Sequence, residues 1–422
     1  MDENDTAIET AVRAGRARWS RRRFITALGA TSLAVAAAPA AFADPGHHGP
    51  GGRPGGRPGF GGGHERDGEQ RGNHEAIGFY GDHQAGVTTP APERLVFTSF
   101  DVTGSSRQSL IDLLQTWTTT AAGLVAASGP GSALTLTLGF GPSLFRTGDG
   151  RDRFGIAALQ PSTLRDLPVF RGDAIDPARS AGDLCVQVCA ASAADAEAAT
   201  QAITRATAGG LQRRWSQTGF GKPSTSPPQE TGRNLMGFKD GTANIRPFDA
   251  AAHSQWVWAQ GSDGTPWMHG GTYLAVRRIV MNLPAWDAEP TAEQERVFGR
   301  FKESGAPLTG GDERSRPDFR AIGADGQPVI ARDAHIALAS PGRNDGVRIL
   351  RRGFNFADAA NDSGLLFMGF VRDLQAQFVP MQTRLAESDL LNEYITARGN
   401  AAFAIPPGVP APGGFVGQTL FV

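Results

Sequence analysis

The first half of the globular sequence alternates between strand-like and helix-like segments in an order that few folds accommodate. The segment "RLVFTSFDV" (94–102) is rich in β-branched and aromatic residues, whereas residues 106–127 carry Leu110, Leu113, Leu114 and Trp117 at helical spacing. Six such segments follow the order strand, helix, strand, strand, helix, strand, at residues 94–102, 106–127, 134–140, 183–190, 192–207 and 211–220. This order predicts a ferredoxin-like α+β unit with an antiparallel sheet.

The second half repeats this order less regularly. Strand-like segments occupy residues 272–283, 346–356, 364–371 and 401–408, and helix-like segments occupy residues 291–304 and 372–387. Thr291 and Gln294 have the spacing of a capping box at the start of the first of these helices. The sequence therefore predicts an α+β protein of two ferredoxin-like halves, residues 76–230 and 231–422, packed together as in a dimeric α+β barrel. Loops as long as 141–182 and 305–334 are usually functional or disordered.

Residues 1–43 have the features of an export signal. Residues 20–25 ("SRRRFI") match the twin-arginine pattern, an apolar run follows, and the ending "AFA" predicts cleavage after Ala43. An uncleaved anchor is the alternative, but the apolar run is shorter than the about 20 residues that span a membrane. Residues 44–75 are rich in Gly, Pro, His and Arg, which predicts a disordered linker. We therefore expect a periplasmic, cell-envelope or extracellular protein without a stable membrane span.

The charge balance does not indicate a nucleic-acid-binding protein, and the cysteine spacing does not indicate a disulfide-stabilised one. The chain has 41 Lys+Arg and 42 Asp+Glu, a balance that does not indicate a nucleic-acid partner. Its two cysteines, Cys185 and Cys189, lie in one strand-like segment, where four steps of roughly 3.3 Å separate them by about 13 Å. A disulfide requires Cα atoms within about 7 Å, so we expect two free, buried thiols. A metal-binding pair is the alternative, although further ligands are lacking nearby.

The segment "GFKDGTANIRP" (237–247) holds a single acid, Asp240, between Gly237 and Gly241. Glycine permits positive φ and a close approach of the backbone to another group. An ordinary Asp-Gly turn is the alternative interpretation. Farther along, His335 lies in "ARDAHIALASPG", ahead of the Arg351-Arg352 pair in "ILRRGFNF". Histidine is the usual axial ligand of haem iron in peroxidases, which makes a haem site the hypothesis to examine.

Taken in this order, the motifs resemble those of the dye-decolourising peroxidase family. The resemblance covers residues 76–410 and extends to "FYGDHQAG" (79–86), "LTLGFGPSLF" (136–145), "WMHGGTYLAVRRI" (267–279) and "LLFMGF" (365–370). With its twin-arginine signal, the chain is most similar to the exported bacterial branch that includes the deferrochelatases. The resemblance implies two ferredoxin-like halves and one haem b per chain, held mainly by the C-terminal half.

The resemblance also implies roles for individual residues. His335 would be the axial ligand of the haem iron, Asp240 the distal carboxylate and Arg351 the distal arginine. Arg352 comes next in the strand and should point to the opposite face of the sheet. Glu393 would accept the hydrogen bond of His335, with Asp389 as the competing candidate. The remaining haem contacts would be Gly237, Gly241 and Thr242 in the distal loop, Arg332 at a propionate, and Phe354 and Leu366 in the wall, where core packing is an equal alternative.

The expected activity is the H2O2-dependent oxidation of dyes, phenols or similar one-electron donors. Asp240 would transfer the proton of the peroxide, and Arg351 would stabilise the charge that develops as the O–O bond breaks. The alternative is a haem-handling deferrochelatase that releases iron for an uptake system through the same pocket. Homo-oligomers are compatible with either function. A pigment-binding shell without activity would need neither Asp240 nor Arg351.

Overall fold

The computed structural model describes residues 77–129, 131–221 and 231–422. The expected export signal (1–43) and linker (44–75) lie outside the described residues. No helix within the described ranges is long and apolar enough to cross a membrane.

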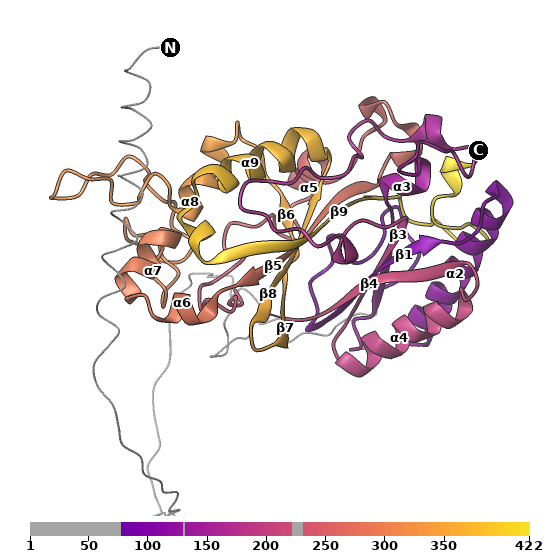
Figure 1. The fold of residues 1–422 in the computed structure, drawn as a ribbon, viewed down its shortest axis with the longest axis horizontal. Helices are drawn as coiled ribbons and strands as arrows, with labels where there is room; N and C mark the ends of the chain where they lie inside the picture. The colour runs from indigo at the N-terminus through magenta and orange to yellow at the C-terminus, as the bar shows by residue number, and fades with distance from the viewer. Residues whose placement is uncertain (1–76, 130, 222–230) are drawn as a thin grey trace, which may run out of the picture. The chain divides into compact units, whose positions relative to one another are not determined.

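The N-terminal half contains the six predicted segments, each bounded within one residue of its prediction. They are β1 (Arg94–Val102), α2 (Arg107–Ala127), β2 (Thr135–Phe140), β3 (Leu184–Ala190), α4 (Ala193–Ala206) and β4 (Leu211–Phe220). The side chains of Ser106 and Ser192 accept hydrogen bonds from main-chain N–H groups in the first turns of α2 and α4, which is why the helices begin there. The strands pair antiparallel in the order β2-β3-β1-β4, and Figure 1 labels β3, β1 and β4 next to one another.

The strands of the C-terminal half are centred on β5 (Thr272–Met281). It pairs antiparallel with β8 (Asp362–Val371) on one side and β9 (Ile395–Ile405) on the other. The strand expected at 346–356 is two short strands, β6 (Leu350–Arg351) and β7 (Phe354–Ala359), both paired with β8. The last strand begins at Ile395, before the expected residue 401.

Two single-residue pairings join the two sets of strands. Phe140 of β2 pairs with Ala404 of β9, and Phe220 of β4 pairs with Asn355 of β7. The chain of pairings β5-β9-β2-β3-β1-β4-β7-β8 then returns to β5 through the β5–β8 ladder. Antiparallel strands and helices therefore form an α+β structure in which both halves contribute to one continuous set of strands.

One helix of the C-terminal half precedes its first strand, and the others lie between its strands in the chain. They are α5 (Ala250–Trp256), α6 (Leu283–Asp287), α7 (Thr291–Phe298), α8 (His335–Leu338) and α9 (Val379–Ser388), with a π-helical turn (Leu374–Phe378) leading into α9. A four-residue helix α3 (Pro142–Phe145) belongs to the N-terminal half. Short 3-10 turns occupy Ala157–Leu159, Pro177–Arg179, Gly261–Asp263, Pro266–Met268, Pro341–Arg343, Leu390–Glu393 and Gln418–Leu420.

The predicted helix 291–304 and its capping box are wrong in detail. Helix α7 ends at Phe298, because Gly299 adopts a left-handed C-cap conformation with φ 83°. Pro290 occupies the N-cap and has no side-chain hydrogen bond to offer. Gln294 instead donates its side-chain N–H to the main-chain oxygen of Trp286 at 2.7 Å.

Side chains on the strands alternate between two environments. One face of β1, β3, β4, β5, β8 and β9 contributes to a shared apolar core that contains Phe97, Trp215, Val276 and Phe403. The opposite face of the N-terminal strands is covered by α2 and α4, through residues such as Leu110 and Trp117. The opposite face of β5, β8 and β9 is left for the site described below.

Cys185 and Cys189 confirm the prediction of free thiols. Both lie on β3 in the shared apolar core, are buried and form no disulfide. Burial raises the pKa of both thiols, for Cys185 well above its ordinary value. The thiols therefore stay protonated and packed like small apolar side chains.

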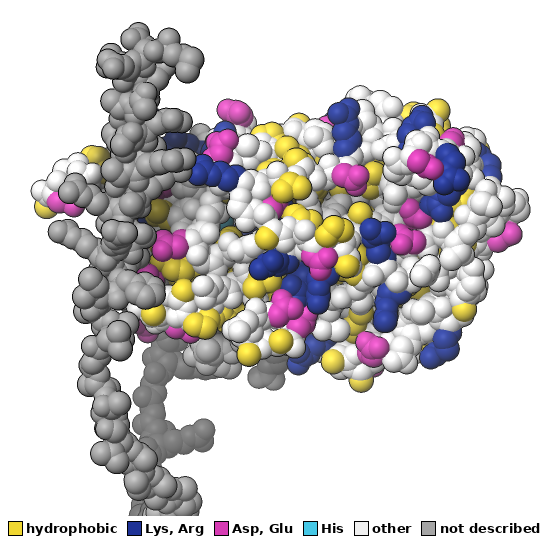
Figure 2. Space-filling view, in the orientation of Figure 1, with side chains coloured by type: hydrophobic (Ala, Val, Ile, Leu, Met, Phe, Trp, Pro, Cys, Tyr) yellow, Lys and Arg dark blue, Asp and Glu magenta, His cyan; other side chains and the backbone are white. Residues whose placement is uncertain are grey.

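The molecular surface carries both signs of charge. Figure 2 shows basic and acidic side chains interspersed with exposed hydrophobic ones on the face in view. This mixture agrees with the net charge of −1 for the whole chain.

Candidate active site

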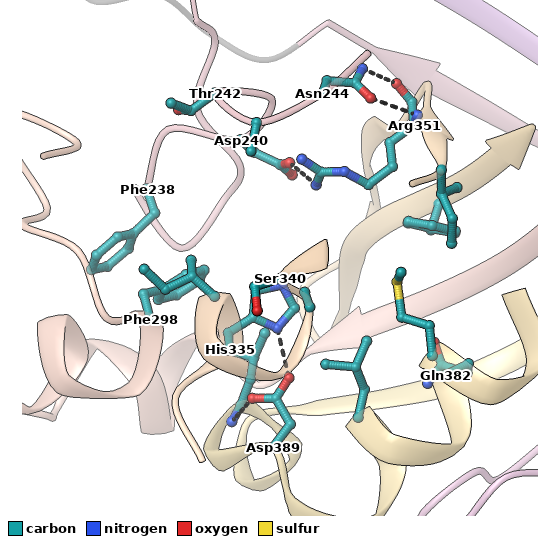
Figure 3. Close-up of a pocket in the computed structure, with 18 of the residues that line it drawn as sticks. Phe238, Asp240, Thr242, Asn244, Phe298, His335, Ser340, Arg351, Gln382 and Asp389 are labelled. Atoms are coloured by element: carbon teal, nitrogen blue, oxygen red, sulfur yellow. Dashed lines mark hydrogen bonds and ion pairs between the residues drawn. The ribbon is translucent and has the colours of Figure 1, made fainter. Parts of the chain in front are cut away.

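A cavity of about 1360 Å³ lies against the outer face of β5, β8 and β9. Its apolar wall includes Ile279 and Met281 from β5, Leu365 and Phe367 from β8, and Ile395 from β9. Helices α8 and α9 and the loop around Asp240 enclose the space opposite these strands (Figure 3). This volume is larger than that of ordinary small-molecule sites, which is about 300–1,000 Å³. The cavity therefore has room for a large planar cofactor.

His335 stands at the first position of α8 and faces into this cavity. Its Nδ1 lies 2.6 Å from Oδ2 of Asp389, which is buried. A main-chain hydrogen bond from Leu390 N to Asp333 O (3.1 Å) joins the two segments that carry this pair. Burial lowers the pKa of His335, but the charge and hydrogen bond of Asp389 outweigh it, so the pKa lies above its ordinary value. With Nδ1 engaged by Asp389, Nε2 is the nitrogen available to a metal ion.

The acceptor of His335 is therefore Asp389, and the expectation for Glu393 is corrected. Glu393 is exposed at the end of the 3-10 turn Leu390–Glu393 and does not line the cavity. Asp389 is the N-cap of that turn, and its Oδ1 accepts a hydrogen bond from Leu391 N at 2.9 Å. This cap fixes one carboxylate oxygen and directs the other toward His335. The sequence signal that could have favoured Asp389 is its type and place, since aspartate is a common N-cap and here it directly precedes "LLNE".

Under the expectation that His335 binds haem iron, replacing Asp389 by asparagine should weaken haem binding or lower the activity by about 10–100-fold, the usual cost of losing the partner of a metal-bound histidine. Glu393→Gln removes a carboxylate four residues away and serves as the matched control. Haem titration followed by absorption would measure both. Equal losses in the two variants would contradict the assignment of Asp389.

The opposite wall of the cavity carries Asp240 and Arg351. Nη1 of Arg351 lies 3.0 Å from Oδ1 of Asp240, and the side chains are 33 % and 14 % exposed. Figure 3 shows this pair on one side of the cavity, with His335 and Asp389 on the other. Gly237 and Gly241 both have positive φ, 86° and 134°, so the loop around Asp240 uses the backbone freedom that the sequence predicted.

Asn244 holds Arg351 in place and was missed by sequence reasoning. Its Nδ2 donates to Arg351 O at 2.7 Å, and its Oδ1 accepts from Arg351 N at 2.9 Å. The side-chain amide of Asn244 therefore hydrogen-bonds the backbone of β6 as a neighbouring strand would. It connects this short strand to the loop that carries Asp240. The only signal in the sequence was its place four residues after Asp240 in "DGTAN".

The remaining predicted residues divide into those that reach the cavity and those that do not. Gly241 and Thr242 line it. Gly237 does not; a side chain there would meet Lys302, since an added Cβ would lie 2.6 Å from its Cε. Arg332 is exposed and outside the lining. Other arginines line the cavity, and besides Arg351 they are Arg171, Arg246, Arg277, Arg300, Arg316, Arg320, Arg343 and Arg348.

The expectation that Phe354 and Leu366 form the pocket wall is corrected. They are paired across β7 and β8 and are fully buried in the shared apolar core. Leu365 and Phe367, one residue to either side of Leu366, face the cavity instead. Successive strand residues point to opposite faces, so a shift of one residue changes the environment completely. Arg352 follows the same rule as predicted: it donates to the main-chain oxygens of Thr89 and Pro90 on the other face.

Comparison with known proteins decides the family. A family model described as "Dyp-type peroxidase, N-terminal" matches residues 84–221, and one described as "Dyp-type peroxidase, C-terminal" matches residues 231–410. The chain belongs to the dye-decolourising peroxidase family. It is accordingly a haem peroxidase, an enzyme that uses haem b to reduce H2O2 with electrons from a second substrate.

Named members of the family are similar along most of their length. A deferrochelatase of Escherichia coli O6:K15:H31 (strain 536) is 33% identical over 436 residues, covering 95% of this chain and 96% of that protein. A dye-decolorizing peroxidase of Thermobifida fusca (strain YX) is 35% identical over 377 residues, covering 80% and 83%. Among solved structures, a DyP-type peroxidase from Cellulomonas bogoriensis is 38% identical with a TM-score of 0.75, covering 82% and 98%. Ferric DtpA from Streptomyces lividans is 36% identical with a TM-score of 0.76, covering 82% and 97%.

Proposed function

We propose that His335 binds the haem iron on one side of the cavity and that Asp240 and Arg351 act on H2O2 at the other. The observation that carries the proposal is the Asp240–Arg351 pair, which faces a histidine already engaged by a carboxylate through Nδ1. The apolar wall formed by Ile279, Met281, Leu365 and Phe367 suits a porphyrin face. Arginines at the cavity lining suit the two propionates, because the guanidinium group matches carboxylate geometry.

Asp240 and Arg351 have different roles in the reaction with peroxide. When bound, haem would supply the two electrons that reduce the peroxide and would regain them one at a time from two donor molecules. Asp240 accepts a proton from one oxygen of H2O2 and returns it to the other, which leaves as water. Arg351 donates hydrogen bonds to the leaving oxygen while negative charge develops on it. The overall change is H2O2 plus two electrons and two protons giving two molecules of water.

Arg351 and its neighbour Arg352 allow a direct test. Arg351→Gln is expected to slow the reaction with H2O2 by about 10²–10³-fold, the usual effect of removing one donor to a developing charge, without lowering Tm. Arg352→Gln should instead lower the free energy of unfolding by about 1–3 kcal/mol, because two main-chain oxygens lose a buried donor, and leave the peroxide rate intact. Stopped-flow absorption and thermal unfolding would separate the two effects. A slow Arg352→Gln enzyme beside a normal Arg351→Gln enzyme would refute the assignment.

The reducing substrate is proposed to be a dye, a phenol or a similar one-electron donor. The similarity to a deferrochelatase supports a second candidate, release of iron from haem for an uptake system, in the same cavity. The two candidates differ in product. Incubation of the haem-loaded protein with a reductant, followed by chromatography of the pigment, would give iron-free intact porphyrin only if the second function holds.

Export and assembly complete the proposal. We infer that residues 1–43 direct twin-arginine export, that residues 44–75 form a linker, and that 76–230 and 231–422 are two ferredoxin-like domains closing a barrel. Support comes from the "SRRRFI" motif and from the strand order β2-β3-β1-β4. Homo-oligomers are part of the same proposal, and size-exclusion chromatography with light scattering would test them.

A further inference from the structure

Two residues that flank Asp240 share one acidic partner on a distant loop. Lys239 Nζ lies 2.5 Å from Oε2 of Glu313, and Thr242 Oγ1 donates to Oε1 of the same carboxylate at 3.0 Å. Asp240 lies between these two attachment points in the chain. Glu313 belongs to the long loop 305–334, which the sequence singled out but the proposed chemistry does not use.

Glu313 is held in a defined position itself. Its side chain is 16 % exposed and that of Lys239 is 17 % exposed, so the ion pair is largely shielded from water. The main-chain oxygen of Glu313 accepts a hydrogen bond from Nη1 of buried Arg300 at 3.0 Å. Nη1 of Arg300 also donates to Gly305 O at 2.7 Å, which ties the start of the loop to the same guanidinium. The carboxylate is therefore anchored from its own backbone as well as from its partners.

The packing around the pair leaves room for no larger residue at Gly305. This glycine has φ 75°, and an added Cβ would lie 2.7 Å from Lys239 Cδ and 3.3 Å from Glu313 Cγ. Partial burial raises the pKa of Glu313, but hydrogen bonds from Lys239, Thr231 and Thr242 and the charge of Lys239 outweigh it, so the pKa lies below its ordinary value. Glu313 thus remains an anionic acceptor for both partners at neutral pH.

We propose that Glu313 is a positioning residue for the peroxide reaction, bridging Lys239 and Thr242 so that Asp240 stays directed at Arg351. The inference rests on the proposed role of Asp240. On its far side the loop is held by Asn244, which binds the backbone of Arg351. Glu313 supplies the matching attachment at Asp240 itself. It also neutralises Lys239, whose unpaired ammonium beside Asp240 would weaken that carboxylate as a proton acceptor.

A double-mutant cycle on the haem-loaded enzyme tests the proposal. Glu313→Ala, Asp240→Asn and the double variant are compared by the second-order rate constant for H2O2. Glu313→Ala is expected to slow the reaction by about 10–100-fold, because a displacement of about 1 Å at a reacting group costs up to that much. In the Asp240→Asn background the same change should have no further effect, since Glu313 acts only through Asp240. Haem absorption and Tm should stay near those of the parent.

Two further variants sharpen the comparison. Asp312→Ala removes an exposed carboxylate from the neighbouring position and should leave the rate unchanged. Glu313→Gln keeps an acceptor for Thr242 without the charge, and should fall between the parent and Glu313→Ala. If Glu313→Ala fails to retain haem, Thr242→Val replaces it in the double-mutant cycle. Thr242→Val removes the hydrogen bond from Thr242 to Glu313 but keeps the ion pair with Lys239, so the rate constant for H2O2 should fall only several-fold.

Each outcome has one meaning. Equal slowing by Glu313→Ala in both backgrounds would overturn the inference, because the residue would then act independently of Asp240. A normal rate in Glu313→Ala beside a slow Asp240→Asn enzyme would overturn the inference and leave the proposed function standing. A normal rate in Asp240→Asn would instead overturn the proposed role of Asp240, on which the inference depends.

Discussion

Replacing Asp240 by asparagine is expected to slow the reaction with H2O2 by about 10²–10⁴-fold, the range contributed by a positioned general acid–base. Asparagine has nearly the size of aspartate and can still accept the hydrogen bond from Nη1 of Arg351. It cannot take up the proton of the peroxide. The loss should therefore fall on the chemical step, while haem content remains that of the parent. Stopped-flow absorption with varied H2O2 measures the rate constant directly.

Asp249 provides a matched control in the same cavity. It lines the cavity and caps α5 by accepting a hydrogen bond from Ala252 N at 2.9 Å. Asparagine is an equally good N-cap, so Asp249→Asn changes the charge of the cavity without disturbing the helix. Its peroxide rate should stay within a few-fold of the parent. If the two variants lose activity alike, the effect of Asp240 is one of cavity charge and its role as proton carrier is excluded.

Replacing His335 by alanine is expected to remove the proposed iron ligand and with it most of the bound haem. Loss of the partner of a ligand costs about 10–100-fold in affinity, and loss of the ligand itself should exceed that range. The purified variant should show a weak or shifted haem absorption band and no fast reaction with H2O2. Added imidazole should restore part of the absorption, because Asp389 remains in place to orient it.

His269→Ala is the control for His335. His269 is exposed and lies outside the lining of the haem cavity. It should keep full haem content, which absorption at fixed protein concentration would show. A His335→Ala protein with the haem spectrum and peroxide rate of the parent would require a different ligand.

Local patterns were sufficient for the order of the secondary structure in the N-terminal half, whereas the principal site residues were predicted through the resemblance to a known family. In the N-terminal half, helix-like segments predicted α2 and α4, and strand-like segments predicted β1 to β4, because each signal acts within a few residues of the chain. The resemblance of the motifs to those of the dye-decolourising peroxidases implied that Asp240, His335 and Arg351 form one site. The structure places all three around one cavity, although they are separated by up to 111 residues in sequence.

The less accurate predictions concern the C-terminal half, where local signals compete. The strand expected at 346–356 is interrupted at Arg352 and Gly353, since Asn244 holds Arg351 and Arg352 turns toward Thr89 and Pro90. These partners come from other segments of the chain. Strand propensity along the segment contains no information about them.

The sequence by itself determined roughly where strands and helices run and which residues are candidates for binding haem and reacting with peroxide. Only the tertiary structure decided that Leu365 and Phe367 face the cavity while Leu366 does not, that Asp389 and not Glu393 reaches His335, and that Glu313 spans Lys239 and Thr242. The physical reason is that periodicity gives the faces of an element but not what covers each face. The partner of a buried polar group is chosen by which distant backbone segments the folded core brings within hydrogen-bonding distance.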